Sequence, residues 1–216
     1  MTKAPTGCRL YAVLEAGEAA GERLAAALAA VDLAAVLIAP AAGDRLQAAE
    51  AKPLVDRARR AEVSALVLDD AGLACAVGAD GVHLGAQGDP EAAYASARQT
   101  VGGGRVVGAS AGISRHAAMV LAEAGADYIG FGAPAHLGDR HKARLRREEL
   151  IAWWAPIFEV PCVAFDVETP EEAHELAAAG ADFVAVALPA ALAPEAAAGL
   201  LRVAAEAIGT GKPSSS

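Results

Sequence analysis

The sequence has few aromatic residues, few cysteines and no excess of positive charge. Aromatic side chains make up 4% of the 216 residues, so the core must be built mainly from Ala, Val, Leu and Ile. The three cysteines, Cys8, Cys75 and Cys162, are odd in number and far apart. This spacing excludes a disulfide framework and a paired-cysteine metal site, and we interpret them as buried thiols in a reducing cytosol.

The net charge of -9 argues against non-specific binding to nucleic acid or to an anionic membrane surface. No apolar run approaches the roughly 20 residues that cross a bilayer. The segment Met1–Cys8 also lacks the apolar core of a secretory signal. We therefore expect a soluble cytoplasmic protein that binds neither nucleic acid nor membrane. Homo-oligomer formation is left open.

Short β-rich runs alternate with longer Ala- and Leu-rich amphipathic stretches along the chain. The predicted strands are Arg9–Leu14, Ala34–Ala39, Ala65–Asp69, Gly81–Leu84, Arg105–Ala109, Tyr128–Phe131, Cys162–Phe165 and Phe183–Ala187. The predicted helices lie near 18–30, 45–60, 71–77, 90–101, 114–124, 146–157, 170–179 and 194–208. Eight strand–helix units are the number that closes a parallel barrel. We predict one (β/α)8 barrel over residues 1–208 and a disordered tail over 209–216, with an open doubly wound sheet as the alternative fold.

An internal repeat supports the barrel prediction. The segments Gly78–Gly85, Gly125–Gly132 and Gly180–Ala187 each begin with Gly-Ala-Asp and continue into an apolar strand. In each case Gly can end the preceding helix in a left-handed conformation. Ser114 and Thr169 are predicted to cap the helices that follow them.

Carboxylates follow the third and fourth predicted strands. Asp69 and Asp70 end the third, and Asp89 lies in the loop after the fourth. In a barrel, residues at the C-terminal ends of strands carry the chemistry, and oxygen ligands on neighbouring loops suit Mg²⁺. The alternative role is that of an N-cap, which we favour for Asp69 and weigh equally with metal binding for Asp70.

His83 and Ser110 lie at the ends of the next two strands. His83 is expected to point into the barrel mouth, either as a hydrogen-bonded wall residue or as an acid or base. Ser110 is small enough to let a phosphate approach, and it is equally compatible with a turn.

The densest charge in the chain lies between Asp139 and Glu149, with basic residues at Arg140, Lys142, Arg144, Arg146 and Arg147. In an acidic protein this segment is a candidate anion site. The alternatives are a solvated loop, an exposed first helical turn or a subunit contact. Arg146 and Arg147 fit an exposed turn best, and Lys142 is the best candidate for the pocket. Whether the segment 139–147 closes over the mouth is left open.

The ordered motifs Leu10–Leu14, Leu66–Asp70, Gly78–Gly85, Val107–Ser110 and Gly125–Gly132 resemble the thiamin phosphate synthase family, which also contains a thiazole tautomerase. The similarity runs from about residue 9 to residue 192, and Ala79–Gly85 is its most specific part. The synthase joins hydroxymethylpyrimidine diphosphate to a thiazole phosphate with Mg²⁺ and releases diphosphate.

The resemblance implies a small phosphorylated or heterocyclic ligand and a set of site residues. Metal ligands would be Asp70 and Asp89, and catalytic residues would be Ser110, Lys142 and His83. The substrate-binding residues would be Asp69, Gly132, His136 and Arg140.

Several segments depart from the family pattern, among them the following three. Ile38–Pro40 replaces a cationic strand end, Phe165–Glu168 replaces a Gly-Gly phosphate cradle, and Ala133 stands at the tautomerase base position. Two alternatives to the synthase therefore stay open. One is a catalytically silent barrel that binds another ligand or a partner, and the other is a tautomerase that uses His83 or His136 as its base.

Overall fold

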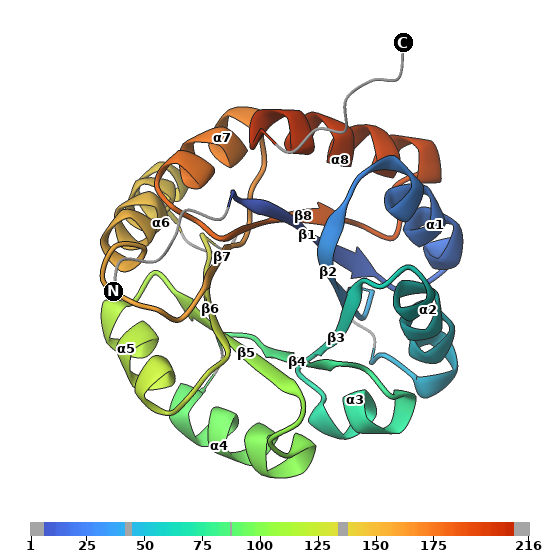
Figure 1. Ribbon diagram of the computed structural model, residues 1–216, viewed down its shortest axis with the longest axis horizontal. Coiled ribbons are helices and arrows are strands. Elements are labelled where there is room, and N and C mark those ends of the chain that lie inside the picture. Colours follow the sequence, from blue (N-terminus) through green and yellow to red (C-terminus); the bar gives the residue numbers. More distant parts are fainter. Residues whose placement is uncertain (1–6, 42–44, 87, 134–137, 210–216) are drawn as a thin grey trace.

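The computed structural model describes residues 7–41, 45–86, 88–133 and 138–209, in which strands and helices alternate from end to end (Figure 1). The strands are β1 (Arg9–Glu15), β2 (Leu33–Ala39), β3 (Ser64–Leu68), β4 (Gly81–Leu84), β5 (Val106–Gly112), β6 (Tyr128–Phe131), β7 (Cys162–Ala164) and β8 (Phe183–Leu188). The helices are α1 (Ala20–Ala30), α2 (Ala48–Arg60), α3 (Ala71–Val77), α4 (Pro90–Val101), α5 (Arg115–Glu123), α6 (Arg140–Trp154), α7 (Pro170–Ala178) and α8 (Pro194–Ala207).

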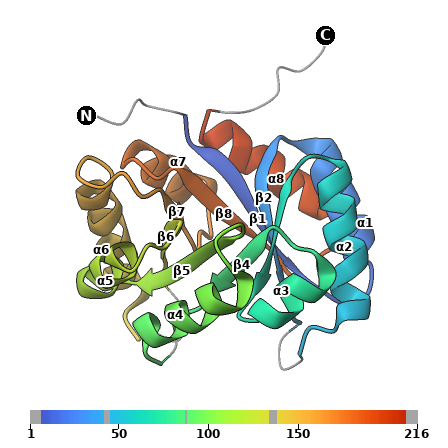
Figure 2. The ribbon, with the colours of Figure 1, turned by 60° about the horizontal axis from the view of Figure 1, so that its bottom comes forward.

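The strands close into a parallel barrel in the order β1 to β8, and the helices form a ring around it (Figures 1 and 2). Closure is made where β1 pairs with β8, from Arg9 opposite Phe183 to Leu14 opposite Leu188. This arrangement confirms the predicted (β/α)8 fold, and the doubly wound alternative is wrong. No helix within the described residues is both long and apolar enough to cross a bilayer.

Two predicted helix caps and one predicted helix-ending glycine are confirmed. The Ser114 and Thr169 side chains accept hydrogen bonds from Ala117 N and Glu172 N, which confirms both as N-caps. Gly78, at the end of α3, has a left-handed φ of 70°, and its N–H donates to carbonyls of the last helical turn.

The apolar residues pack in two shells because side chains alternate across each strand. The outer shell lies between the strands and the helices. The inner shell fills the barrel and contains Tyr11, Ala35, Leu37, Leu66, Tyr128, Val163 and Ala185. Cys8 and Cys162 are buried, as predicted, whereas Cys75 is partly exposed. Burial raises the pKa of the Cys8 thiol to about 12, which keeps it protonated.

Three predicted boundaries are wrong, and each bears on the site. Helix α6 begins at Arg140 and not near residue 146, so the basic segment is helical. Strand β5 continues to Gly112, which places Ser110 within it. Strand β3 ends at Leu68, so Asp69 lies beyond the strand. The predicted tail lies outside the described residues from position 210 onward, and the domain limits remain a prediction.

Candidate functional site

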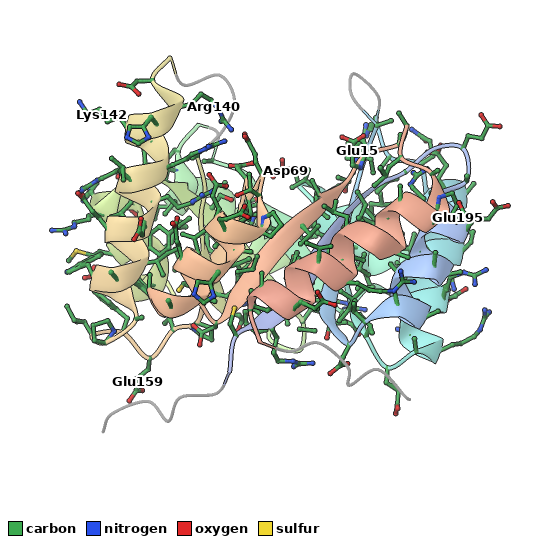
Figure 3. All side chains as sticks on the ribbon, turned by 90° about the horizontal axis from the view of Figure 1, so that it is seen from above. Glu15, Asp69, Arg140, Lys142, Glu159 and Glu195 are labelled. Carbon is green, nitrogen blue, oxygen red and sulfur yellow. The ribbon has the colours of Figure 1, made fainter. Side chains whose placement is uncertain are left out.

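The C-terminal ends of the strands define one end of the barrel. Figure 3 shows Glu15, Asp69 and Arg140 at this end and Glu159 at the opposite one. Glu15 closes β1 and Asp69 directly follows β3, so this end is the rim where barrel enzymes carry their active sites.

Four polar side chains form a hydrogen-bonded chain inside the barrel. The hydroxyl oxygens of Tyr11 and Tyr128 lie 3.0 Å apart, and the Tyr128 oxygen lies 2.8 Å from Nδ1 of His83. On the other side of the ring, His83 Nε2 lies 2.9 Å from Ser110 Oγ. Both nitrogens of the buried imidazole are therefore paired, and Ser110 is the member of the chain that is closest to the rim.

Aromatic packing fixes the His83 ring. It stacks on Tyr128 at 5.5 Å between centroids and tilts against Phe165 at 4.7 Å. The side chain is 2% exposed, and this burial lowers the His83 pKa to about 3. The imidazole is therefore neutral near pH 7. It is held in place to orient Ser110, and it is not exposed to take up protons at the mouth.

Gly130 on β6 and Gly132, directly after this strand, face the barrel interior, on the same side of the chain as Tyr128. A Cβ at Gly130 would lie 2.9 Å from the Phe165 ring and 3.1 Å from Ser110 Oγ. A Cβ at Gly132 would lie 2.5 Å from Oδ2 of Asp166. Strands β5, β6 and β7 therefore come together at this point only because β6 carries no side chain there.

The two aspartates after β3 differ in their roles: the cap prediction is confirmed for Asp70 and wrong for Asp69. Asp70, and not Asp69, is the N-cap of α3: its Oδ1 accepts a hydrogen bond from Leu73 N at 2.8 Å. The favoured cap role for Asp69 is therefore wrong. Asp69 has a left-handed φ of 55°, and its Oδ1 accepts a hydrogen bond from Gly85 N at 2.6 Å. Both aspartates line one hollow with Arg45, whose Nη2 lies 3.3 Å from Asp70 Oδ2.

Asp89 caps the next helix in the same way, with Oδ1 accepting from the backbone N–H groups of Glu91 and Ala92. In both aspartates Oδ2 takes no part in the cap, but Asp70 Oδ2 is paired with Arg45 Nη2 at 3.3 Å, so an ion at Asp70 would compete with this arginine. Mg²⁺ is commonly held by one or two carboxylates together with water and substrate phosphates, and this donor set fits such an ion. Among the described residues no cluster of three or more His, Cys, Asp or Glu side chains could form a closed metal cage.

A buried arginine supports the end of β7. Arg147 is 1% exposed, and its Nη1 donates to the carbonyl oxygens of Phe165 at 2.7 Å and Asp166 at 2.8 Å. Its Nη2 lies 3.5 Å from the Glu172 carboxylate. The prediction that Arg147 belongs to an exposed turn is wrong, because α6 begins earlier and turns this residue toward β7. Burial lowers the Arg147 pKa, and Glu172 opposes that shift.

The other arginines on this side of α6 also have acidic partners. Arg140 and Arg144 both form ion pairs with Glu168, in the loop after β7. Arg144 Nε lies 2.8 Å from Oε1 of Glu172, and Arg140 Nη1 also donates to the Ala133 carbonyl at 2.5 Å. Three of the five basic residues, Arg140, Arg144 and Arg147, are therefore engaged by Glu168 of the loop or Glu172 of α7 before any ligand arrives.

The structure brings some of the predicted site residues together and separates others. Ser110, His83 and Gly132 share the interior of the mouth, whereas Lys142 points to the outer side of α6, away from Arg140 (Figure 3). Lys142 lines a groove formed by the first turns of α6 and by Ile113 in the loop after β5. His136 lies outside the described residues.

Four residues of the mouth were not predicted from the sequence, namely Tyr11, Tyr128, Phe165 and Arg147. The signal for the first three was strand alternation. Tyr128 shares the parity of Gly130 and Gly132, and Phe165 shares the parity of Val163 inside the barrel. The signal for Arg147 required the correct start of α6.

A profile of the family described as thiamine monophosphate synthase matches residues 10–189, which is most of the chain and includes every element from β1 to β8. The chain belongs to this family. The predicted resemblance is therefore confirmed.

Individual members of the family align over much of the barrel. A thiamine-phosphate synthase from Rhodospirillum centenum is 42% identical over 188 residues, covering 84% of this chain and 88% of the relative. A second, from Thiobacillus denitrificans, is 36% identical over 179 residues and covers 82% and 78% of the two chains. A solved thiamine phosphate pyrophosphorylase from Pyrococcus furiosus superposes with a TM-score of 0.69 over 92% of this chain and 96% of that structure. At 23% identity, the last similarity supports the fold alone.

Proposed function

We propose that this protein is a thiamine-phosphate synthase that joins hydroxymethylpyrimidine diphosphate to a thiazole phosphate and releases diphosphate. The observation that carries the proposal is the 42% identity to the Rhodospirillum centenum synthase across 84% of the chain. Ser110, hydrogen-bonded to His83 near the rim, is the residue at which we expect the substrate diphosphate to bind.

The work of such a site is to hold two substrates in line and to offset the charge of the departing diphosphate. Ser110 is placed to donate its hydroxyl proton to a diphosphate oxygen, and His83 is the positioning residue behind it. Tyr128 in turn fixes the His83 ring. Gly130 lets the Phe165 ring and Ser110 Oγ approach β6 closely, because a Cβ there would lie 2.9 Å and 3.1 Å from them.

Asp70 and Asp89 would hold Mg²⁺ through Oδ2, since each uses Oδ1 to cap a helix, and at Asp70 the ion would take the place of the Arg45 ion pair. The ion, when bound, supplies positive charge that stabilises the leaving diphosphate. Among the α6 cations, Arg140 is better placed than Lys142 to reach a substrate at the mouth, because its side chain lies on the barrel side of the helix (Figure 3).

The tautomerase hypothesis has less support. His83, one of its two candidate bases, is 2% exposed with both ring nitrogens hydrogen-bonded. A base must reach the proton that it removes.

The test is diphosphate release from both substrates with and without Mg²⁺, using the wild-type protein and Asp70→Asn. Asn keeps the helix cap but loses the charge, so we expect release to fall by about 100-fold with little change in stability. The control is Asp139→Asn, which makes the same change at the α6 cap, where no metal is proposed. If the wild-type protein forms no product, the silent-barrel alternative holds.

A further inference from the structure

Two side chains bridge the closure of the barrel between β1 and β8 at the rim. The first is Arg23, near the start of α1, which is 1% exposed. Its Nη1 donates to the carbonyl oxygens of Glu18 at 2.7 Å and Ala190 at 2.8 Å, and its Nη2 donates to that of Glu15 at 2.7 Å. The buried guanidinium therefore joins the β1–α1 loop to the β8–α8 loop, which lie at opposite ends of the chain.

The second link comes from the Glu15 side chain, at the end of β1. Its Oε2 accepts a hydrogen bond from Ala190 N at 2.9 Å. Ala190 is thus held at both its N–H and its C=O, by one side chain from β1 and one from α1. We call Glu15, Arg23 and Ala190 together the rim clamp.

The loop that the rim clamp holds has no polar side chain. Residues 189–193 are Pro, Ala, Ala, Leu and Ala, and within the loop Leu192 N donates to the Pro189 carbonyl at 3.0 Å. Such a loop can bind a phosphate only through its backbone N–H groups, whose directions depend on how the loop is held. The rim clamp therefore controls the only groups that this loop can offer to a ligand.

The β1–α1 side of the rim clamp contains strained backbone. Gly17 has a φ of 120°, and Ala19, directly before α1, has a left-handed φ of 56° that alanine rarely adopts. Burying the Arg23 guanidinium also costs free energy, which its carbonyl partners offset. Strained backbone concentrates at functional sites, so this arrangement indicates a role beyond closure of the barrel.

The rim clamp lies across the barrel from the groups proposed to bind diphosphate. Ser110 on β5, with Asp70 and Asp89 after β3 and β4, occupies one side, and β8 and β1 lie opposite (Figure 1). The thiazole nitrogen must approach the pyrimidine methylene carbon from a side that the diphosphate does not occupy. Val13 and Ala187 are paired there on the interior side of the strands, and Ala187 is exposed. The mouth therefore presents an open apolar surface that suits a heterocyclic ring.

We propose that Glu15 and Arg23 are positioning residues that hold the β8–α8 loop in the conformation that binds the thiazole phosphate. This inference rests on the proposed function and adds how the second substrate is bound. Both side chains act through the backbone of Ala190 and not by touching the substrate. A loop that is already held in its binding conformation loses less conformational freedom when the ligand arrives, so the affinity for this substrate is higher.

Coupling kinetics with each substrate varied in turn test the proposal on Glu15→Ala and Glu15→Gln. Glu15→Ala removes the acceptor for Ala190 N, so the KM for thiazole phosphate should rise by about tenfold. The KM for hydroxymethylpyrimidine diphosphate and kcat should change by less than about threefold. Glu15→Gln keeps an acceptor oxygen and should remain within about twofold of the wild type in all three parameters.

Arg23→Lys tests the other half of the rim clamp. It keeps the positive charge but replaces the planar fork, which donates to both loops, with a single ammonium group, so we expect the same selective rise of about tenfold in the KM for thiazole phosphate. The matched control is Glu22→Ala, which removes a carboxylate from an exposed position in the first turn of α1. It should leave the kinetics unchanged. An unchanged KM in Arg23→Lys would overturn the role of Arg23.

The inference is overturned if Glu15→Ala leaves the KM for thiazole phosphate within about twofold of the wild type, raises both KM values alike, or behaves as Glu15→Gln does. A wild-type protein that forms no product contradicts the synthase function, and calorimetric titration with thiazole phosphate then decides the role of the rim clamp. Binding about tenfold weaker in Glu15→Ala and unchanged in Glu15→Gln supports the inference. Equal affinities, or no detectable binding by the wild-type protein, overturn it.

Discussion

The two sides of the barrel mouth are built on different principles. On the β4–β5 side, neutral groups from three strands meet directly, with His83 bonded to Ser110 and Tyr128. On the β7 side, charged groups are paired between α6 and the segment after β7, with Arg147 and Arg144 of α6 against Glu172 of α7 and Glu168 of the loop. The first arrangement depends on strand positions alone, whereas the second depends on where a helix begins.

This difference has energetic consequences. In a neutral buried network, each hydrogen bond contributes modestly to the free energy of unfolding, and here all of the bonded groups lie inside the barrel. A buried cation is more demanding, because removing it leaves its partners unpaired in a low-dielectric setting. We therefore expect the β7 side to be the more sensitive of the two to substitution.

The largest effect is expected from Arg147→Met. The change leaves the Phe165 and Asp166 carbonyl oxygens without their buried donor, so unfolding should become easier by about 3–5 kcal/mol. Urea denaturation measures the loss. Arg146→Met is the control, because Arg146 is partly exposed and pairs with the exposed Glu149, so about 0.5 kcal/mol is expected. Equal losses of unfolding free energy in the two variants would mean that the buried Arg147 contributes no more to stability than a partly exposed arginine.

The sequence predicted the neutral side better than the charged one. Alternation within Gly81–Leu84 is sufficient to place His83 inside the barrel, and the caps at Ser114 and Thr169 follow from residue type. The choice between Asp69 and Asp70 as a cap depended on one residue of strand length, which composition does not fix.

The ion pairs of the β7 side were not predicted because the Arg-rich composition of residues 140–147 was interpreted as a loop, and α6 was predicted to begin near residue 146. Once the helix begins at Arg140, its buried residues Ala143, Arg147, Leu150, Ile151 and Trp154 follow a helical period. The period was present in the sequence, but an arginine on an apolar face is not readily assigned as buried. Its role depends on β7 carbonyl oxygens that no local pattern reveals.

The next effect concerns pH and the neutral side. The His83 pKa falls from 6.5 to about 3 on folding, so the unfolded chain takes up a proton as the pH falls below 6.5 and the folded chain does not. Stability is therefore full above 6.5 and is lost as the pH falls toward 3. Between about pH 7 and about pH 5 the loss attributable to His83 should be about 2 kcal/mol.

Denaturation of the wild-type protein and His83→Gln at both pH values isolates this contribution. The variant should lack that part of the pH dependence, while His174→Gln, at an exposed position on α7, should retain it. Parallel pH profiles for the wild type and His83→Gln would show that the imidazole is not held neutral. The β4–β5 side could then no longer be described as a neutral network in contrast to the charged β7 side.

A smaller effect is expected from Tyr128→Phe. The hydroxyl bonds both His83 and Tyr11, so its loss leaves His83 Nδ1 unpaired and should cost about 1–3 kcal/mol. Tyr11→Phe leaves the Tyr128–His83 bond intact and should cost about 1 kcal/mol or less. Thermal unfolding of both variants measures the order, and the reverse order would place the centre of the network at Tyr11.

The smallest effect is expected from Lys142→Ala, which tests whether cations beyond Arg140 on α6 contribute to diphosphate release. The Lys142 side chain points to the outer side of α6, so we expect kcat/KM for diphosphate release to fall by less than about twofold. Arg140→Ala, on the barrel side, should reduce it by about tenfold, because it removes a cation near the mouth and frees Glu168 to repel the diphosphate. A loss with Lys142→Ala as large as that with Arg140→Ala would restore Lys142 as a diphosphate contact. It would also require the first turn of α6 to rearrange when the substrate binds, which a matched pair of titrations with inorganic diphosphate would then detect as weaker binding in both variants.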